Sequence, residues 1–537
     1  MFILSKEESS LDSLQTFRSE LRGIGTSFSP IEEFKIGAYF LYWFSAKPQD
    51  QLTVYRNGFI VGKSNFEEKF KLGSRNDKEE VLPETLHPLL QSTKIVIENN
   101  EVKIIPNGIT SIYYSESQNI SDHQLLIAKH EQIRPDSNLV QLLGGIGYLP
   151  GNLTLFHCIR KIPYLFSLNL NNLQLNQEEE FRPEPSDDDK MVERLIKVIP
   201  ENRNVNISMS GGMDSRFVLG LLLKKGIEPK LITMKGDELE IVKELSEKLN
   251  LELEITKSAL IDDYMYTLMT DARIYFRGGN YSQMLNTYKP DELIYNGISI
   301  LPINENSFAS AWKKPGKLSM IYEDLIDYAL IQRVPLDGFT KFKNPFTKSQ
   351  MKSFLTKELS FGKDYYNSKT RKQWGTWFYH LHRGLTWSPA HLADLSFFIY
   401  PVFSLSDKKA TEIGISSTAY QNFNKERLRR MNQRLFETVR VDYANDRKFE
   451  SGSRLIIPLS KYYNEYFKKF FKRFKQLKKY LSQTNTDWFS EVSKLEATNF
   501  KHYFTEGFDE LLNDNQASFN EKRIAVTLNH VLLFLNK

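Results

Sequence analysis

A pair of glycines between an apolar segment and a helical segment is the feature that most restricts how this chain folds. The sequence there is Val205-Asn-Ile-Ser-Met-Ser-Gly-Gly-Met-Asp-Ser-Arg-Phe-Val-Leu219. Residues 205–209 are short and apolar, which is typical of a buried parallel strand, and the two glycines remove β-carbons where the backbone must turn. Asp214 and Ser215 then open a helix over residues 217–225. We therefore predict a strand, a tight turn and a helix in direct succession.

The turn and the helix start carry the donors of a phosphate-binding site. Backbone N–H groups in the first turn of a helix have no intrahelical partner, and the helix dipole adds partial positive charge there. The hydroxyls of Ser210 and Ser215 are further donors, and the Asp214 carboxylate is a candidate ligand for a Mg²⁺ ion that neutralises a polyphosphate. A plain glycine turn is the alternative interpretation. The full six-residue pattern between a strand and a helix is much rarer than Gly-Gly alone, which favours the phosphate site.

Residues 210–215, Ser-Gly-Gly-Met-Asp-Ser, resemble the PP-loop of the ATP pyrophosphatases, and with their flanking segments they are most similar to the asparagine synthetase family. No Gly-Lys-Ser/Thr follows, so the pattern is not of the Walker type. Members of the family cleave ATP between the α and β phosphates, adenylate a carboxylate, and let an amine displace AMP to form an amide. The resemblance implies an AMP-forming ligase that needs ATP and Mg²⁺. It implies ATP and pyrophosphate binding by Ser210, Gly211, Gly212, Asp214 and Ser215, with Asp214 also a catalytic residue.

Three further segments predict a doubly wound parallel sheet. Residues 230–234 and 251–256 are predicted strands, and residues 238–249 between them form an amphipathic helix. In such a sheet the ligand lies outside the carboxyl ends of the strands. Met209 and Met234 end the first two strands, so we expect them near the nucleoside, although both residues would also suit an ordinary core.

Three more site residues follow from the resemblance. Asn296 and Gly297 stand in residues 292–302, where the family has a fourth strand and a Ser-Gly-Glu-Gly-x-Asp-Glu segment, and the resemblance places both residues beside the nucleoside. The second metal-binding aspartate of that segment is missing, which leaves Asp214 as the implied carboxylate ligand. Lys425 lies in a segment similar to a basic helix of the family, so Lys425 is the second catalytic candidate, for stabilising transition-state charge. A solvated helix face is the alternative interpretation of Lys425.

The first part of the chain, residues 1–180, is predicted to be mainly β, with Asn and Gly turns between short apolar runs. It resembles the glutaminase domain of the family, which is a β sandwich of the N-terminal-nucleophile hydrolase type. Phe2 stands where the family has its nucleophilic cysteine, and phenylalanine has no nucleophilic atom. The one cysteine of the chain, Cys158, is predicted to be a packed core residue. We therefore expect a catalytically inactive glutaminase-like domain.

The domain boundary is predicted at residues 177–186, where two prolines and an acidic run interrupt the strand pattern. Residues 187–537 would form the ATP pyrophosphatase domain with a helical C-terminal extension. A chain of 537 residues is too long for one core, and 41% hydrophobic with 26% charged residues is typical of a globular protein. No segment is apolar enough to span a membrane, the start is not a signal peptide, and a cytoplasmic location is expected.

A basic segment at residues 461–481 is predicted to be a helix with an aromatic docking face, or alternatively a surface for an acidic peptide, an anionic glycan or a membrane. With a net charge of only +5, nucleic acid is not an expected partner.

The leading hypothesis is a glutamine-independent ligase that joins a small-molecule or peptide carboxylate to ammonia or a substrate amine. Loss of the cysteine is similar to what occurs in β-lactam synthetases and lasso-peptide cyclases, so a lasso-type peptide macrocyclase is one alternative. A sugar-acid amidation enzyme is another. A pseudoenzyme that serves as a nucleotide-binding scaffold is the alternative from a different class. The sequence does not indicate which carboxylate and amine are the substrates, or the oligomeric state.

Overall fold

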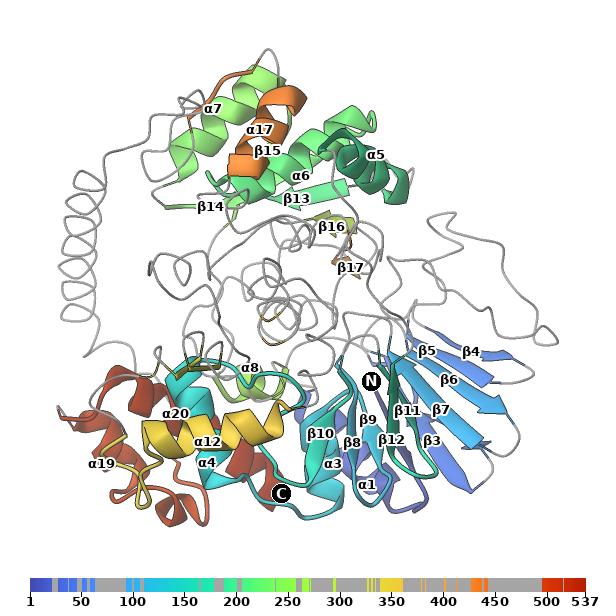
Figure 1. Cartoon of the computed structure of the whole chain (residues 1–537), viewed down its shortest axis with the longest axis vertical. Coiled ribbons are helices and arrows are strands. Elements are labelled where there is room, and N and C mark those ends of the chain that lie inside the picture. The colour runs from blue at the N-terminus through green and yellow to red at the C-terminus, as the bar shows by residue number, and fades with distance from the viewer. Residues whose placement is uncertain are drawn as a thin grey trace.

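The computed structural model is a mixed α/β structure with two antiparallel sheets, one parallel sheet and surrounding helices (Figure 1). It describes residues 1–21, 28–36, 38–45, 51–55, 58–62, 93–98, 101–106, 111–163, 166–177, 188–199, 205–236, 238–256, 263–269, 271, 293–295, 326–327, 330–331, 334, 339–360, 378, 382, 400–401, 412, 426–436, 439–442, 495–514 and 516–537. The predicted combination of an antiparallel β-rich part with a parallel sheet is confirmed at this level.

Two antiparallel sheets occupy the N-terminal part of the chain. The first has the order β10-β8-β9-β1-β3-β2 and contains β1 (Phe2–Ser5), β2 (Glu32–Ile36), β3 (Tyr39–Trp43), β8 (Tyr113–Ser115), β9 (Ile120–Ser121) and β10 (Ile159–Lys161). The second has the order β12-β11-β7-β6-β5-β4 and contains β4 (Gln51–Tyr55), β5 (Gly58–Gly62), β6 (Thr93–Glu98), β7 (Glu101–Pro106), β11 (Phe166–Asn169) and β12 (Gln174–Gln177). Both sheets lie at the lower right of Figure 1.

Strand β1 shows how these layers are packed. Phe2 and Leu4 belong to an apolar cluster that includes Ile95 and Ile104 of the second sheet. Ile3 belongs instead to a cluster with helix α1 (Ser10–Leu21). Because successive side chains of a strand point to opposite faces, the first sheet is covered by the second sheet on one side and by helices on the other. Phe2 is therefore a core residue and is only 1% exposed.

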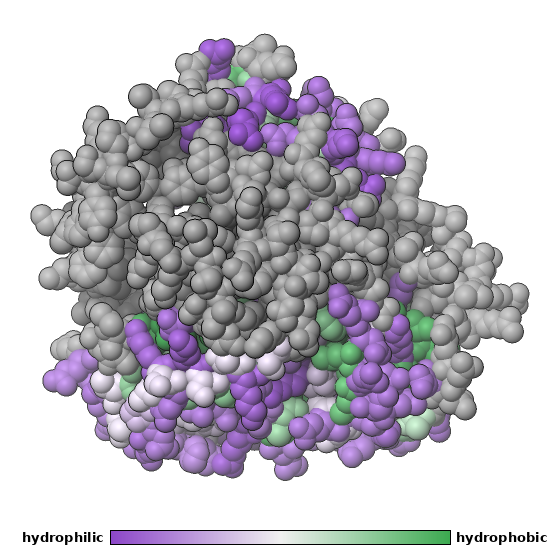
Figure 2. All heavy atoms as spheres, in the orientation of Figure 1, coloured by the Kyte–Doolittle hydropathy of each residue, from purple (hydrophilic) through white to green (hydrophobic). Residues whose placement is uncertain are grey.

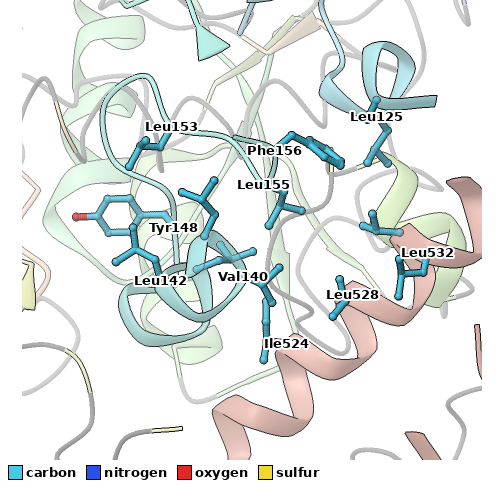
Figure 3. Packing of buried hydrophobic residues seen from close by; sticks show 14 of the residues in the cluster. Leu125, Val140, Leu142, Tyr148, Leu153, Leu155, Phe156, Ile524, Leu528 and Leu532 are labelled. Atoms are coloured by element: carbon cyan, nitrogen blue, oxygen red, sulfur yellow. The ribbon is translucent and has the colours of Figure 1, made fainter. Parts of the chain in front are cut away.

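The C-terminal helix packs against helices from the N-terminal part. Helices α3 (Gln124–His130), α4 (Ser137–Ile146) and α20 (Phe519–Asn536) share one apolar cluster, and Figure 3 shows Ile524, Leu528 and Leu532 along α20 beside Val140 of α4. Further helices of this region are α8 (Asp263–Met269), α12 (Lys348–Glu358), η8 (Phe500–His502) and α19 (Phe508–Asn513). The two ends of the chain thus contribute to a common core. The predicted boundary at 177–186 lies almost entirely outside the described residues.

The parallel sheet has the order β15-β14-β13-β16-β17, and every pairing in it is parallel. Its strands are β13 (Val205–Ser208), β14 (Lys230–Met234), β15 (Leu253–Thr256), β16 (Leu293–Tyr295) and β17 (Tyr400–Pro401). Helices α5 (Asp188–Val198), α6 (Met213–Lys224), α7 (Leu239–Leu249) and α17 (Glu426–Leu435) belong to this part (Figure 1). The chain first adds β14 and β15 on one side of β13 and then β16 and β17 on the other, so the strand order reverses between β13 and β16.

The prediction that Cys158 is a core residue is wrong, because its side chain is exposed. Cys158 lies in a turn between Phe156 and Ile159, and the N–H of Ile159 donates to the carbonyl of Phe156 at 3.3 Å. The apolar side chains of Phe156 and Ile159 are fully buried on either side of the turn. The turn directs Cys158 outward, which the apolar composition of the segment did not reveal.

No helix among the described residues is long and apolar enough to cross a membrane. Figure 2 shows a described surface on which hydrophilic residues predominate, with small hydrophobic areas between them.

Helices α6 and α17 are in close contact at Gly220. A β-carbon added to Gly220 would lie 2.9 Å from Cβ of Leu435 and from a ring carbon of Phe436. We expect Gly220→Ala to lower the free energy of unfolding by about 1–2 kcal/mol, because overpacking outweighs the better helix propensity of alanine. Urea denaturation measures this loss. Gly236→Ala is the control, because a β-carbon there meets nothing within 4 Å, and equal losses in both variants would contradict the prediction.

Candidate functional site

The loop at residues 209–212 joins β13 to α6 at the carboxyl end of β13. This end of the strand lies where the strand order reverses between β13 and β16. In open parallel sheets that position forms the crevice in which ligands bind. The predicted strand, tight turn and helix are confirmed, although α6 begins at Met213, earlier than the predicted start at 217.

Two serines hold the loop together from within. The Ser215 hydroxyl donates to the Ser210 carbonyl at 3.0 Å and accepts from the Ser210 N–H at 3.2 Å. The two hydroxyl oxygens are 3.1 Å apart, and the Gly212 N–H donates to Oγ of Ser210 at 3.2 Å. Ser215 is only 2% exposed, whereas Ser210 is exposed. The Ser215 hydroxyl therefore serves the shape of the loop, and the Ser210 hydroxyl is the accessible one of the pair.

Gly212 occupies the N-cap position of α6, and no side chain caps the helix there. A β-carbon on Gly212 would lie 3.1 Å from Oγ of Ser210, so a larger residue would crowd the loop. Asp214 is half-buried in the first turn of α6. A helix with glycine at its N-cap has no side chain there to accept from its first N–H groups, which can donate to an anion. The carboxylate in the first turn offers an oxygen ligand for a cation.

Glu238 extends its carboxylate to this loop. The N–H of Gly211 donates to Oε2 of Glu238 at 2.9 Å. Glu238 is the N-cap residue of α7, yet its side chain makes no capping bond there. The loop amide thus already binds an anionic oxygen. From the sequence, Glu238 was predicted only as the start of a helix. Its place after β14 was the available signal, because the carboxyl end of β14 lies at the same edge of the sheet as that of β13.

The two methionines lie at the ends of adjacent strands, as predicted. Met209 is buried in the apolar cluster of the parallel-sheet part, and its N–H donates to the Ile232 carbonyl at 2.7 Å. Met234 is half-buried at the last position of β14. Met209 therefore packs as a core residue, and Met234 is the more accessible of the two.

Three predicted site residues lie outside the described residues, namely Asn296, Gly297 and Lys425. In the sequence, Asn296 and Gly297 directly follow β16, the strand beside β13, and Lys425 directly precedes α17. The predicted basic helix at 461–481 is also outside the described residues.

Helix α17 is attached to the first turn of α6. The side-chain amide of Asn432, which is fully buried, donates to the Met213 carbonyl at 3.0 Å. The guanidinium of Arg216, only 1% exposed, donates to the carbonyls of Val441 and, at 3.1 Å, Asp442. At about 1.5 Å of rise per residue, the start of α17 is about 9 Å along the helix axis from Asn432. These contacts hold α17, and the segment at residues 441–442 that follows it, against the start of α6.

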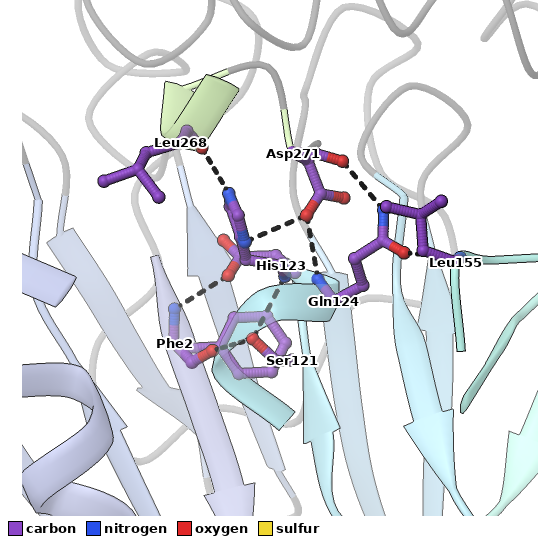
Figure 4. Close-up of polar contacts among 8 residues, drawn as sticks. Phe2, Ser121, His123, Gln124, Leu155, Leu268 and Asp271 are labelled. Carbon is purple, nitrogen blue, oxygen red and sulfur yellow. Dashed lines mark hydrogen bonds and ion pairs between the residues drawn. The ribbon is translucent and has the colours of Figure 1, made fainter. Parts of the chain in front are cut away.

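A second polar cluster surrounds the backbone of Phe2 (Figure 4). The Phe2 N–H donates to the Asp122 carboxylate at 3.0 Å, and the Ser121 hydroxyl donates to the Phe2 carbonyl at 2.7 Å. The ring of His123 lies between the Asp271 carboxylate, 2.9 Å from Nδ1, and the Leu268 carbonyl, 2.7 Å from Nε2. At the position where the family resemblance implies a nucleophile, the structure thus has a buried phenylalanine.

Among the described residues no group of three or more His, Cys, Asp or Glu side chains is arranged to hold a metal ion. Mg²⁺ does not require such a group, because it is commonly held by one or two carboxylates together with phosphates and water. Asp214, half-buried beside the loop donors, suits that role.

No protein-family model matches this chain, and a search of curated proteins finds no match.

Proposed function

We propose that the loop at 209–215 binds ATP with Mg²⁺, and that the protein uses ATP to activate a carboxylate as an acyl-adenylate and to form an amide. The observation that carries this proposal is the 2.9 Å hydrogen bond from the Gly211 N–H to a carboxylate oxygen, at an uncapped helix start and at the reversal of a parallel sheet. A loop that already binds one anionic oxygen has the donor geometry for another.

In this proposal the residues have separate roles. Ser210, Gly211 and Gly212 hold the phosphates that leave as pyrophosphate, and Ser215 keeps the loop in shape. Asp214 holds Mg²⁺, which supplies positive charge to the polyphosphate when bound. Met234, Asn296 and Gly297 line the nucleoside, whereas Met209, the other methionine predicted there, belongs to the core. Lys425 stabilises the charge that develops in the transition state.

The amine in the proposed reaction is ammonia or an amine of the substrate. Phe2 is buried between the two antiparallel sheets, so the residue that would start glutamine hydrolysis in a related glutaminase is here part of the core. The carboxylate substrate is a small molecule or a peptide. If the substrate is a peptide, the protein is a peptide macrocyclase; if it is a sugar acid, the protein is a sugar-acid amidation enzyme. A cytoplasmic location and the division into residues 1–180 and 187–537 are further parts of it.

One observation favours a second candidate, a nucleotide-binding scaffold without turnover. The Gly211 N–H is engaged by the protein's own Glu238, so an incoming phosphate must replace an existing bond. The missing second metal aspartate points in the same direction.

The product of ATP cleavage tests the proposal. With Mg²⁺, we expect ATP at about 100 times its dissociation constant to stabilise the protein by about 2.7 kcal/mol, measured by thermal unfolding. With a suitable carboxylate and amine, we expect AMP and pyrophosphate, separated by chromatography. ADP as the only product would reject the mechanism, and stabilisation by ATP without any AMP would favour the scaffold.

A further inference from the structure

The Glu238 carboxylate serves the loop after β13 and not its own helix. It lies at the N-cap of α7 without a capping bond, and its carboxylate reaches the loop after β13, 27 residues away in the sequence. Glu238 is half-buried, so its side chain is partly shielded from solvent where it makes this contact. The carboxylate oxygen occupies the place at the Gly211 N–H that an oxygen of a bound phosphate would need.

The charges around this contact oppose a bare polyanion. The described residues 209–216, 234–236 and 238 include two carboxylates, those of Asp214 and Glu238. The cationic side chains among the same residues are those of Lys235 and Arg216. Lys235 is exposed, and the buried guanidinium of Arg216 donates to the carbonyls of Val441 and Asp442. An anion that enters the loop must break the bond from Gly211 to Glu238 and then lie close to negative charge. A Mg²⁺ ion carried by the anion offsets this repulsion.

We propose that Glu238 makes the loop selective for polyphosphate that carries Mg²⁺ over the same anion without metal. This inference rests on the proposed function, because it assumes that the loop is a phosphate site. Specificity is a difference between two affinities, and a charge placed against the wrong ligand is one way to create it. Glu238 lowers the affinity for bare pyrophosphate much more than the affinity for magnesium pyrophosphate. The loop is thereby kept from binding free anions and stays available for the metal complex.

Calorimetric titration of the full chain with inorganic pyrophosphate tests this inference, once with Mg²⁺ and once with EDTA. For wild type we expect much tighter binding with Mg²⁺. Glu238→Ala should raise the affinity for bare pyrophosphate roughly tenfold, the order associated with one hydrogen bond to a charged group, and change the affinity with Mg²⁺ less than about threefold. Glu238→Gln keeps an oxygen for Gly211 but removes the charge, so its gain should be intermediate.

Glu240→Gln is the matched control, because Glu240 lies in the first turn of the same helix and pairs with Lys243 at 2.8 Å. It should bind both forms of pyrophosphate like wild type. Equal affinity for bare pyrophosphate in wild type, Glu238→Ala and Glu238→Gln would overturn the inference. A large loss of affinity with Mg²⁺ in Glu238→Ala would also overturn it, because Glu238 would then be a metal ligand. No binding of either form by any of the four proteins would reject the phosphate site itself.

Discussion

Replacing Asp214 by alanine is expected to lower AMP formation, and the exchange of labelled pyrophosphate into ATP, at least about 100-fold. Asp214 is half-buried in the first turn of α6, directly after the glycine turn, and it is our single candidate for holding the metal. Without its carboxylate the charge of the polyphosphate is less well neutralised when the bond between the α and β phosphates breaks. Exchange measured at saturating ATP separates this effect from weaker binding.

Two further variants make the Asp214 result specific. Asp214→Asn keeps the size of the side chain and should lose most of the Mg²⁺-dependent stabilisation by ATP while the fold stays intact. Asp189→Ala removes the same charge from the first turn of α5, where Asp189 pairs with Arg434 on the surface at 2.6 Å, and should exchange pyrophosphate like wild type. If Asp214→Ala retained wild-type exchange, the phosphate site would have to lie elsewhere.

Local sequence patterns predicted the parallel sheet well. The strand at 230–234 has the predicted bounds, and the helix predicted at 238–249 begins one residue later, at Leu239. These elements have clear apolar periodicity, so short-range preferences suffice. The start of α6 was predicted too late, because its N-cap is Gly212, which carries no side-chain signal for a helix start.

Contacts between distant segments could not be predicted in the same way. Nothing in the local sequence of Glu238 indicates that its carboxylate reaches Gly211, and nothing near Asn432 indicates a bond to Met213. The packing of α20 on α4 likewise joins residues nearly 400 positions apart. These contacts depend on how whole elements pack, whereas the predicted loop depends on six consecutive residues. The roles of Asn296, Gly297 and Lys425 stay predictions.

The second large effect is expected at the buried pair formed by His123 and Asp271. Asp271→Ala should lower the free energy of unfolding by about 3–5 kcal/mol at mildly acidic pH, because it leaves a buried imidazolium without its partner. The side chain of His123 is 5% exposed and that of Asp271 is 13% exposed. Asp271 also accepts from the Gln124 N–H at 3.0 Å, so the variant additionally removes one hydrogen bond to the first residue of α3. Urea denaturation measures the loss, with Asp327→Ala as control, since Asp327 pairs with Lys352 on the surface and should change stability by no more than about 1 kcal/mol.

The pH dependence distinguishes this charge effect from a simple loss of packing. Burial lowers the pKa of His123. The charge and hydrogen bond of Asp271, with smaller contributions from Leu268 and Asp122, together raise the pKa by more than burial lowers it, so the pKa lies above its ordinary value of 6.5. A raised pKa in the folded state means that the stabilisation is complete below the unfolded pKa and is lost as the pH rises through the folded pKa. The difference in stability between wild type and Asp271→Ala should therefore narrow as the pH rises above about 6.5. Parallel stability curves across that range would show that the pair contributes by packing alone.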